Sequence, residues 1–261
     1  MPDQHAKDVY VYGVVCDGEA LTIATEGIED AGPARFVRHD GLAAIVADVP
    51  PHPVPTTRRN LSAHAEVLAE VARQTTVLPM RFGVAFPDER RIVDEFLGPS
   101  GYDLASLLDR FEGMVEATLR GLYEDEDARL REVVEQEPEI AGLREQVRAT
   151  PEDAGYYARI RLGELVAAAL EKRRAADERR ILDRLEPFAH AVERDTELPE
   201  RVVVKAAFLI ERTKLPAFDG ELDALARELA ARIRFSCAGP LALHSFVDVT
   251  PRAEPMPGER S

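Results

Sequence analysis

The sequence predicts an α+β protein with two domains and a flexible tail. Short runs rich in β-branched and aromatic residues alternate with longer segments whose apolar residues repeat every three or four positions. These are the patterns of strands and of amphipathic helices. Each half of the 261 residues contains both patterns, and an acidic run near the middle separates the halves. We therefore expect an N-terminal domain over 1–123, a C-terminal domain over 124–249 and a flexible tail over 250–261.

Three strands are expected at the start of the chain. Residues 9–15 are valine and tyrosine around one glycine, a composition that favours a strand. Residues 35–38 and 42–49 predict two more, and Asp40-Gly41 between them suits the positive φ of a tight hairpin turn. The prolines of 50–55 then predict an extended loop.

A helix and a buried strand are expected next. Apolar residues at helical spacing predict a helix over 60–74, in which His64 is expected to be packed or half-exposed rather than a ligand. The apolar run 77–86 predicts a buried strand, and its one charge is Arg81. Because a buried arginine needs a partner, we expect Arg81 to pair with a carboxylate elsewhere in the chain.

The rest of the first half predicts two helices and a strand. The first helix covers 87–97, and Gly98-Pro99 is expected to stop it. Asp103 is a suitable cap for a second helix that ends at Gly113. Residues 114–123 follow as a strand.

The second half predicts strands alternating with one long helix and one shorter helix. The expected elements are two short polar helices in 126–150 divided by Pro138, a long helix from 151 to 192 kinked at Pro187, a strand over 201–212, a helix over 216–233 and a last strand over 234–249. With the strand at 114–123, this order predicts a ferredoxin-like domain with its helices on one face of the sheet.

Composition excludes several classes of partner. The net charge of −15 argues against nucleic acid and anionic membranes, which attract basic surfaces. The sequence has no apolar run long enough to span a bilayer and no signal-peptide pattern, so a cytoplasmic protein is expected. Cys16 and Cys237 lie in apolar runs and are expected to be buried free thiols.

No motif for catalysis, cofactor binding or metal binding is recognisable. The sequence lacks a phosphate-binding loop and a nucleophile elbow, and its six histidines do not have zinc-ligand spacing. Glu112, Glu116 and Glu164 each lie in or beside an apolar segment. We expect one of them to form a buried ion pair with Arg81 or Arg161.

An ordered set of short motifs resembles the gas vesicle protein family GvpF/GvpL. The central one is Leu78-Pro79-Met80-Arg81-Phe82-Gly83, preceded by the helix that contains His64. The other matching stretches are 10–13, 41–46, 161–166, 206–210, 218–219, 239–241 and 245–247. One departure is Ala242-Leu243-His244, where the family often has Pro-Pro-Tyr. The motifs do not separate the F branch from the L branch.

The resemblance implies an accessory or minor structural protein that is required for gas vesicle formation and has no enzymatic activity. Its implied partners are the hydrophobic main shell subunit, bound during assembly, and other accessory proteins, in the cytoplasm or on the vesicle. The motif positions Arg81, Gly83, Arg161, Gly163 and Glu164 are expected to serve the fold, and the two glycines to allow close backbone packing. No cofactor is implied.

Two alternatives remain open from the residues alone. One is an enzyme of ferredoxin-like fold with an unmarked carboxylate site, which a deep pocket with convergent polar groups around Arg81 would favour. The other is a ligand-sensing module that dimerises through its sheets. The sequence does not determine the oligomeric state.

Overall fold

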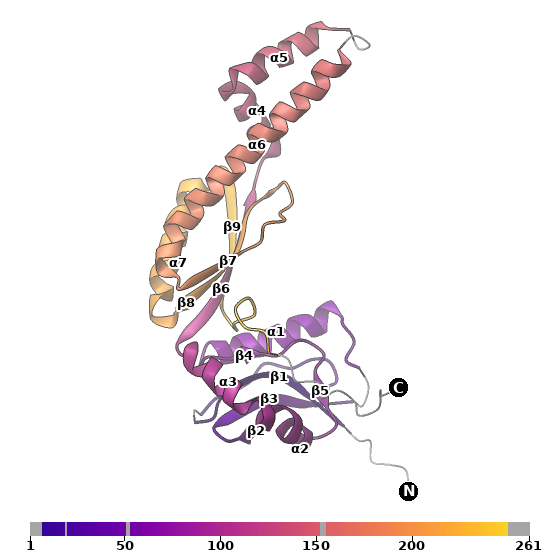
Figure 1. Ribbon diagram of the computed structural model, residues 1–261, viewed down its shortest axis with the longest axis vertical. Helices are drawn as coiled ribbons and strands as arrows, with labels where there is room; N and C mark the ends of the chain where they lie inside the picture. The colour runs from indigo at the N-terminus through magenta and orange to yellow at the C-terminus, as the bar shows by residue number, and fades with distance from the viewer. Residues whose placement is uncertain (1–6, 19, 51–52, 152–154, 250–261) are drawn as a thin grey trace, which may run out of the picture. The chain divides into compact units, whose positions relative to one another are not determined.

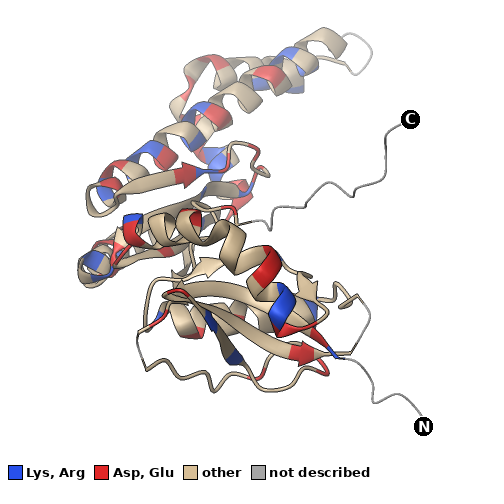
Figure 2. Ribbon diagram, turned by 60° about the horizontal axis from the view of Figure 1, so that its bottom comes forward, with Lys and Arg blue, Asp and Glu red and all other residues tan. Residues whose placement is uncertain are grey.

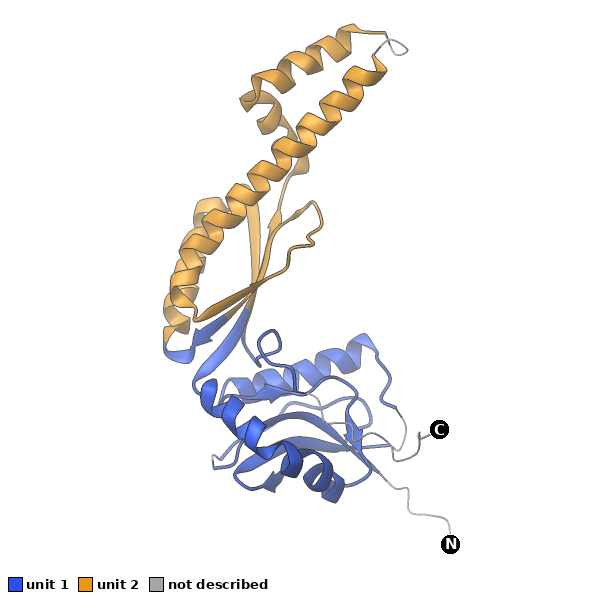
Figure 3. Cartoon of the chain, in the orientation of Figure 1, with its two compact units in different colours: residues 1–117, 209–213, 238–261 blue, residues 118–208, 214–237 orange. Residues whose placement is uncertain are grey.

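The computed structural model describes residues 7–18, 20–50, 53–151 and 155–249, and it mixes helices and strands (Figure 1). The predicted tail over 250–261 lies outside the described residues. Two compact units are distinguished (Figure 3). The first contains Met1–Ala117, Leu209–Thr213 and Ala238–Ser261, and the second contains Thr118–Phe208 and Lys214–Cys237. The chain therefore passes between the units more than once.

The first unit contains an antiparallel sheet. Its long strands are β1 (Asp8–Cys16), β2 (Arg35–His39) and β3 (Leu42–Val49). With the short strand β4 (Leu78–Pro79), the order is β2-β3-β1-β4. Asp40 and Gly41 have φ values of 44° and 79°, so the predicted hairpin turn is confirmed. These three strands match the predicted ones to within two residues at each end.

Helices cover both faces of this sheet. Alternate residues of β1 point to opposite sides and therefore pack against different helices. Tyr10 and Tyr12 pack with residues of α1 (Arg58–Ala72). Val9 and Val11 pack with residues of the opposite helical layer, which consists of α2 (Glu89–Ile92), the π-helix η1 (Val93–Leu97) and α3 (Gly98–Arg110).

The secondary structure of this unit differs from the prediction in two places. Residues 77–86 are not one strand but two short ones, β4 (Leu78–Pro79) and β5 (Ala85–Phe86), with a turn at Phe82-Gly83 between them. Both short strands pair with β1. Gly98-Pro99 does not separate two helices by a loop, because Pro99 occupies the first turn of α3, where its missing N–H is tolerated. The helix therefore begins before Asp103, and the prediction that Asp103 caps it is wrong.

The second sheet has the order β7-β8-β6-β9. Its strands are β6 (Met114–Tyr123), β7 (Ala191–Arg194), β8 (Val202–Glu211) and β9 (Ile233–Leu241). Between them lie α4 (Glu126–Gln136), α5 (Pro138–Ala149), α6 (Tyr156–Leu185), the short 3-10 turns Glu186–Phe188 and Arg212–Lys214, and α7 (Leu215–Leu229). The two polar helices divided at Pro138 and the strands β6 and β8 are confirmed.

The ends of three predicted elements are corrected. The long helix stops at Leu185 rather than at Val192, because Pro187 lacks the N–H that would continue the helical bonding. Ala191 and Val192 instead begin β7. The final helix stops at Leu229, so that Ile233 starts β9, and this strand ends at Leu241 rather than at Val249.

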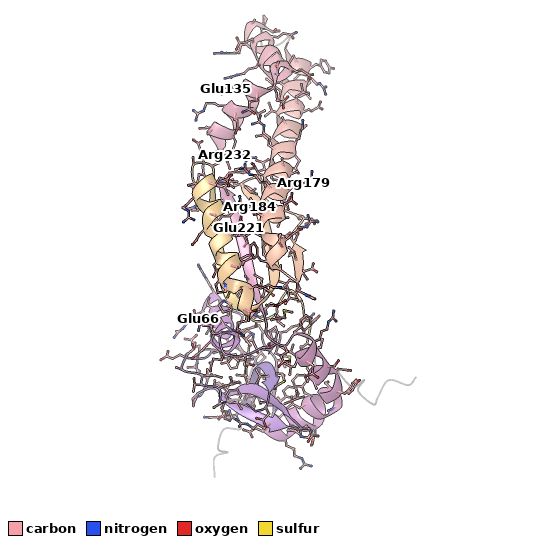
Figure 4. All side chains as sticks on the ribbon, turned by 90° about the vertical axis from the view of Figure 1, so that its left-hand side faces the viewer. Glu66, Glu135, Arg179, Arg184, Glu221 and Arg232 are labelled. Carbon is pink, nitrogen blue, oxygen red and sulfur yellow. The ribbon has the colours of Figure 1, made fainter. Side chains whose placement is uncertain are left out.

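The two longest helices of the second unit lie side by side. Ile181 and Leu185 of α6 and Phe218 of α7 are buried, and the Phe218 ring is 5.1 Å from that of Phe208 on β8. Arg184 of α6 forms ion pairs with Glu221 and Glu228 of α7 across the helix pair. Figure 4 shows Arg184 beside Glu221. The apolar contacts attach both helices to the sheet, and the ion pairs connect the helices to each other.

Acidic and basic residues alternate along the helices of the second unit (Figure 2). In the described part of the chain, no helix combines the length and apolar character that crossing a bilayer requires. Cys16 and Cys237 are both exposed, so the expected burial of the thiols is wrong. Cys16 is the last residue of β1, and Cys237 lies in β9, an outer strand of its sheet, so apolar neighbours in sequence do not imply burial of these side chains.

Candidate functional site

The turn between β4 and β5 presents Arg81 at the surface. Gly83 has a φ of 93°, which side-chain-bearing residues rarely adopt, so the chain turns here instead of continuing as a strand. The Arg81 side chain is 67% exposed and donates from Nε and Nη2 to the Asp248 carboxylate, with Nε 3.1 Å from Oδ1. The expected carboxylate partner is confirmed, but the expected burial of Arg81 is wrong.

A small pocket of about 210 Å³ lies beside this ion pair. Its lining residues are Pro79, Met80, Arg81, His244, Val247, Asp248 and Val249. Met80 and Val249 also form an isolated parallel bridge, which holds the segment after β9 against the turn. With its one arginine already bound to Asp248, the pocket offers little room and little unpaired charge for a substrate.

A buried hydrogen-bond network supports the turn from the interior. Tyr10 and His64 are 0% and 5% exposed, and the Tyr10 hydroxyl lies 2.9 Å from His64 Nδ1. His64 Nε2 lies 3.2 Å from the Met80 carbonyl oxygen, and the Gly83 N–H donates to the Tyr10 hydroxyl at 3.2 Å. Since the Met80 carbonyl only accepts, Nε2 carries the proton. The network thus connects β1, α1 and the turn.

Burial strongly affects the titration of this network. Desolvation, with a smaller contribution from His244, lowers the pKa of His64 to about 4. Desolvation also raises the pKa of Tyr10, against the opposing effect of the hydrogen bond from Gly83. His64 is therefore neutral near pH 7, and the expectation that it is a packed residue is confirmed.

Replacing Arg81 with alanine is expected to lower the free energy of unfolding by only about 0.2–1 kcal/mol, because exposed ion pairs contribute little. Urea denaturation of R81A, D248A and the double variant measures the coupling between the two side chains. Arg90→Ala is a matched control, since Arg90 forms an exposed pair with Asp94. A loss above about 2 kcal/mol for R81A would contradict an exposed, weakly stabilising pair.

The three singled-out glutamates have different surroundings. Glu116 is buried, and it accepts hydrogen bonds from the Ser245 N–H at 2.8 Å and the Ser245 hydroxyl at 3.0 Å. Glu164 pairs with Arg161 at 3.7 Å, but both side chains are about 60% exposed, so the expected buried ion pair is wrong. Glu112 is exposed at the end of α3.

The other motif positions lie on the surface of α6. Arg161, Gly163 and Glu164 are all exposed. A Cβ atom built on Gly163 would meet no described atom within 4 Å, so the expectation that this glycine allows close packing within the chain is wrong. Gly163 instead lines a groove of about 510 Å³ between α6 and the connection from β7 to β8.

Sequence reasoning did not identify several of these groups. Asp248 is 167 positions from Arg81, and Tyr10 is 54 from His64, so no local spacing indicates either pair. The groove wall formed by Thr196–Glu200 comes from a loop without a motif. Among the described residues, no cluster of three or more His, Cys, Asp or Glu side chains is placed to hold a metal ion.

Comparison with known proteins identifies relatives along nearly the whole chain. The family model for gas vesicle synthesis protein GvpL/GvpF matches residues 8–248. Gas vesicle protein F of Streptomyces sp. strain CB03234 is 34% identical over 244 residues, which are 92% of this chain and 99% of that protein. Gas vesicle protein F of a Nostoc strain is 23% identical over 94% of this chain and 100% of its own length.

Two solved structures share the fold. The crystal structure of gas vesicle protein GvpF from an Anabaena strain superposes with a TM-score of 0.81 at 22% identity, covering 94% of this chain and 99% of that one. GvpF from Microcystis aeruginosa superposes with a TM-score of 0.73 at 21% identity, covering 92% and 98%. From the match over 8–248 and the Streptomyces relative, the chain belongs to the GvpL/GvpF family of gas vesicle synthesis proteins.

Proposed function

We propose that this protein is a gas vesicle accessory or minor structural protein, required for vesicle formation, that binds the hydrophobic main shell subunit during assembly. It works in the cytoplasm and on the growing vesicle, together with other accessory proteins, and catalyses no reaction. The family match over 8–248 carries this proposal. A small apolar subunit aggregates unless its apolar surface or strand edges are covered, and an acidic protein with net charge −15 keeps such a complex soluble.

Two surfaces suit this role. The second sheet has β7 and β9 as its outer strands, and an outer strand offers unpaired backbone groups to a strand of another chain. Most residues of β9 are exposed. The groove beside α6 is the second surface, and it combines apolar side chains with a charged rim.

We further propose two folding domains, over 1–123 and 124–249, of which the second is ferredoxin-like once β6, at the end of the first, is counted as its first strand. The succession of strand, helices, strand, strand, helix and strand from β6 to β9, and the sheet order β7-β8-β6-β9, support the fold. We also propose that Arg81 and Gly83 serve the fold of the turn, since Gly83 has a positive φ and Arg81 holds Asp248.

Deleting the gene from its gas vesicle cluster is expected to abolish vesicles, and a plasmid copy is expected to restore them. In the same cells, tagged full-length protein is expected to retain the main shell subunit on an affinity column after a salt wash. The control is a tagged acidic protein of similar charge. Normal vesicles in the deletion strain would refute the requirement, and a folded protein that retains no shell subunit would refute the binding.

A further inference from the structure

One face of α6 packs on the sheet at its C-terminal end and is uncovered at its N-terminal end. Asp177, Ile181 and Leu185 are buried four residues apart. Toward the N-terminus, alternating steps of three and four continue the same face. The positions on it are Arg174, Leu170, Ala167, Gly163, Ile160 and Tyr156. Such steps place apolar side chains in one seam, as in a coiled coil. We call residues 156–170 at these positions the α6 seam.

The α6 seam has no helix of its own chain against it among the described residues. Tyr156 and Ile160 are 61% and 44% exposed, and Gly163 and Ala167 are exposed as well. The helices α4 and α5 contact α6 on another face (Figure 1). There Arg173 donates to Gln136 of α4 at 2.8 Å and pairs with Glu132. Arg173 lies about 100° around the helix from Arg174, so the two faces differ.

The seam leads directly into the groove of about 510 Å³. Gly163, Ala167 and Leu170 form one wall, and Leu198 with its neighbours in the β7–β8 connection forms the other. Small residues at Gly163 and Ala167 let a second helix approach α6 closely, because the open space at Gly163 is not filled by any described atom. The shape of the surface therefore fits a helix lying along α6.

The rim of the groove favours a basic occupant. Glu197 and Glu200 are exposed on the wall opposite the seam. Glu164 and Glu171 flank the seam with side chains 62% exposed, and each has an arginine partner on α6, Arg161 and Arg174 respectively. The two arginines of the groove already have partners. Arg174 pairs with Glu171 and Glu178. Arg129 lies over the Tyr123 ring and donates to the Glu200 carbonyl. A second copy of this chain, with net charge −15, would bring acidic rims together.

We propose that the α6 seam and its groove bind an amphipathic helix of a partner protein, with apolar residues at steps of three and four and Lys or Arg on its flanks. Binding buries Tyr156, Ile160, Gly163, Ala167 and Leu170 and sets the partner's basic side chains against the glutamates of the rim. This surface and partner chemistry go beyond the proposed function, and they do not depend on which protein supplies the helix.

The test uses the full chain and a labelled synthetic peptide of roughly three heptads, with Leu and Ala along one seam and Lys on both flanks. Fluorescence anisotropy is expected to show saturable binding. Ala167→Arg is expected to weaken it at least about tenfold, because it places bulk and positive charge in the seam. Ala168→Arg is the matched control, since Ala168 is an exposed alanine one position outside the seam, and it is expected to change binding less than about twofold.

The charge on the flanks of the peptide and the oligomeric state of the free protein provide two further tests. A peptide with Glu in place of Lys is expected to bind at least about tenfold more weakly, and less so at high salt. Equal binding of both peptides, equal effects of A167R and A168R, or no binding of the Lys peptide would overturn the proposal. A dimer of the free protein that A167R dissociates would also overturn it and would assign the seam to a second copy. Circular dichroism checks that both variants remain helical.

Discussion

Replacing Asp177 with alanine is expected to lower the free energy of unfolding by about 3 kcal/mol. Asp177 is 8% exposed and anchors α6 to the rest of its unit. It accepts a hydrogen bond from the Tyr123 hydroxyl of β6 at 2.8 Å and a bidentate pair from Arg232, whose Nη2 lies 3.1 Å from Oδ2. Figure 4 shows Arg232 beside the helices.

The size of this effect follows from what the substitution leaves behind. Tyr123 is 1% exposed, so its hydroxyl loses its acceptor in a place that water does not reach, which costs roughly 1–3 kcal/mol. Arg232 loses a charged partner, although its side chain is 38% exposed and Glu132 stays 3.7 Å away. Burial raises the pKa of Tyr123, and the hydrogen bond to Asp177 raises it further. The hydroxyl therefore remains a donor over the physiological range.

Matched variants separate the network from general effects on α6. Tyr123→Phe removes only the hydroxyl and is expected to cost about 1 kcal/mol. Asp183→Ala alters an exposed aspartate of the same helix and is expected to stay within about 0.5 kcal/mol of the wild type. Urea denaturation followed by circular dichroism measures all three. If D177A is no worse than D183A, Asp177 does not anchor the helix.

The strongly periodic parts of the fold could be predicted from the sequence. In β1, β3 and β8 the composition favours strands, and Asp40-Gly41 has a clear turn preference. The strand prediction for 77–86 was wrong because apolar character predicts burial and does not determine the backbone conformation. Met80 is buried, yet the chain turns after it, where Gly83 adopts a positive φ. The helix end predicted at Gly98-Pro99 was wrong because the same pair of residues suits both the end of one helix and the first turn of the next.

The candidate site was less predictable, since its parts come from distant segments. Arg81 indicates that a carboxylate partner is needed. The chain has 48 acidic residues, however, and the sequence gives no reason to select Asp248 among them. On α6, apolar residues recur at helical spacing along the whole helix, yet Tyr157 and Ile160 are exposed. The periodic signal was read over the whole helix, although only its C-terminal part packs on the sheet. An apolar stripe therefore indicates that this face of the helix makes contacts, either within the chain or with a partner protein.

Stability is expected to fall as the pH is lowered from about 6.5 to about 4, and His64 is expected to account for up to about 3 kcal/mol of the loss. Its pKa is about 4 in the folded protein, below the ordinary value of 6.5, because burial disfavours the charged ring. The unfolded chain therefore takes up the proton first. The contribution is complete above pH 6.5 and disappears as the pH falls through this window.

The structure explains why the charged form is disfavoured. In the neutral ring, Nε2 donates to the Met80 carbonyl and Nδ1 accepts from Tyr10. A proton on Nδ1 opposes the Tyr10 hydroxyl hydrogen and places a charge where the side chains of β1 and α1 exclude water. His244 has a pKa lowered by desolvation and acts in the same direction, so the difference between variants is the informative quantity.

Urea denaturation at several pH values, for the wild type and His64→Gln, measures this contribution. The variant is expected to be less stable than the wild type near pH 7, because glutamine fits the network imperfectly, but to lose less stability on acidification. Exposed His190→Gln is the control and is expected to keep the wild-type slope. If H64Q keeps that slope as well, His64 does not control acid stability. Because Met80 and Gly83 belong to the same network, hydrogen exchange at the turn is expected to rise first as His64 takes up a proton.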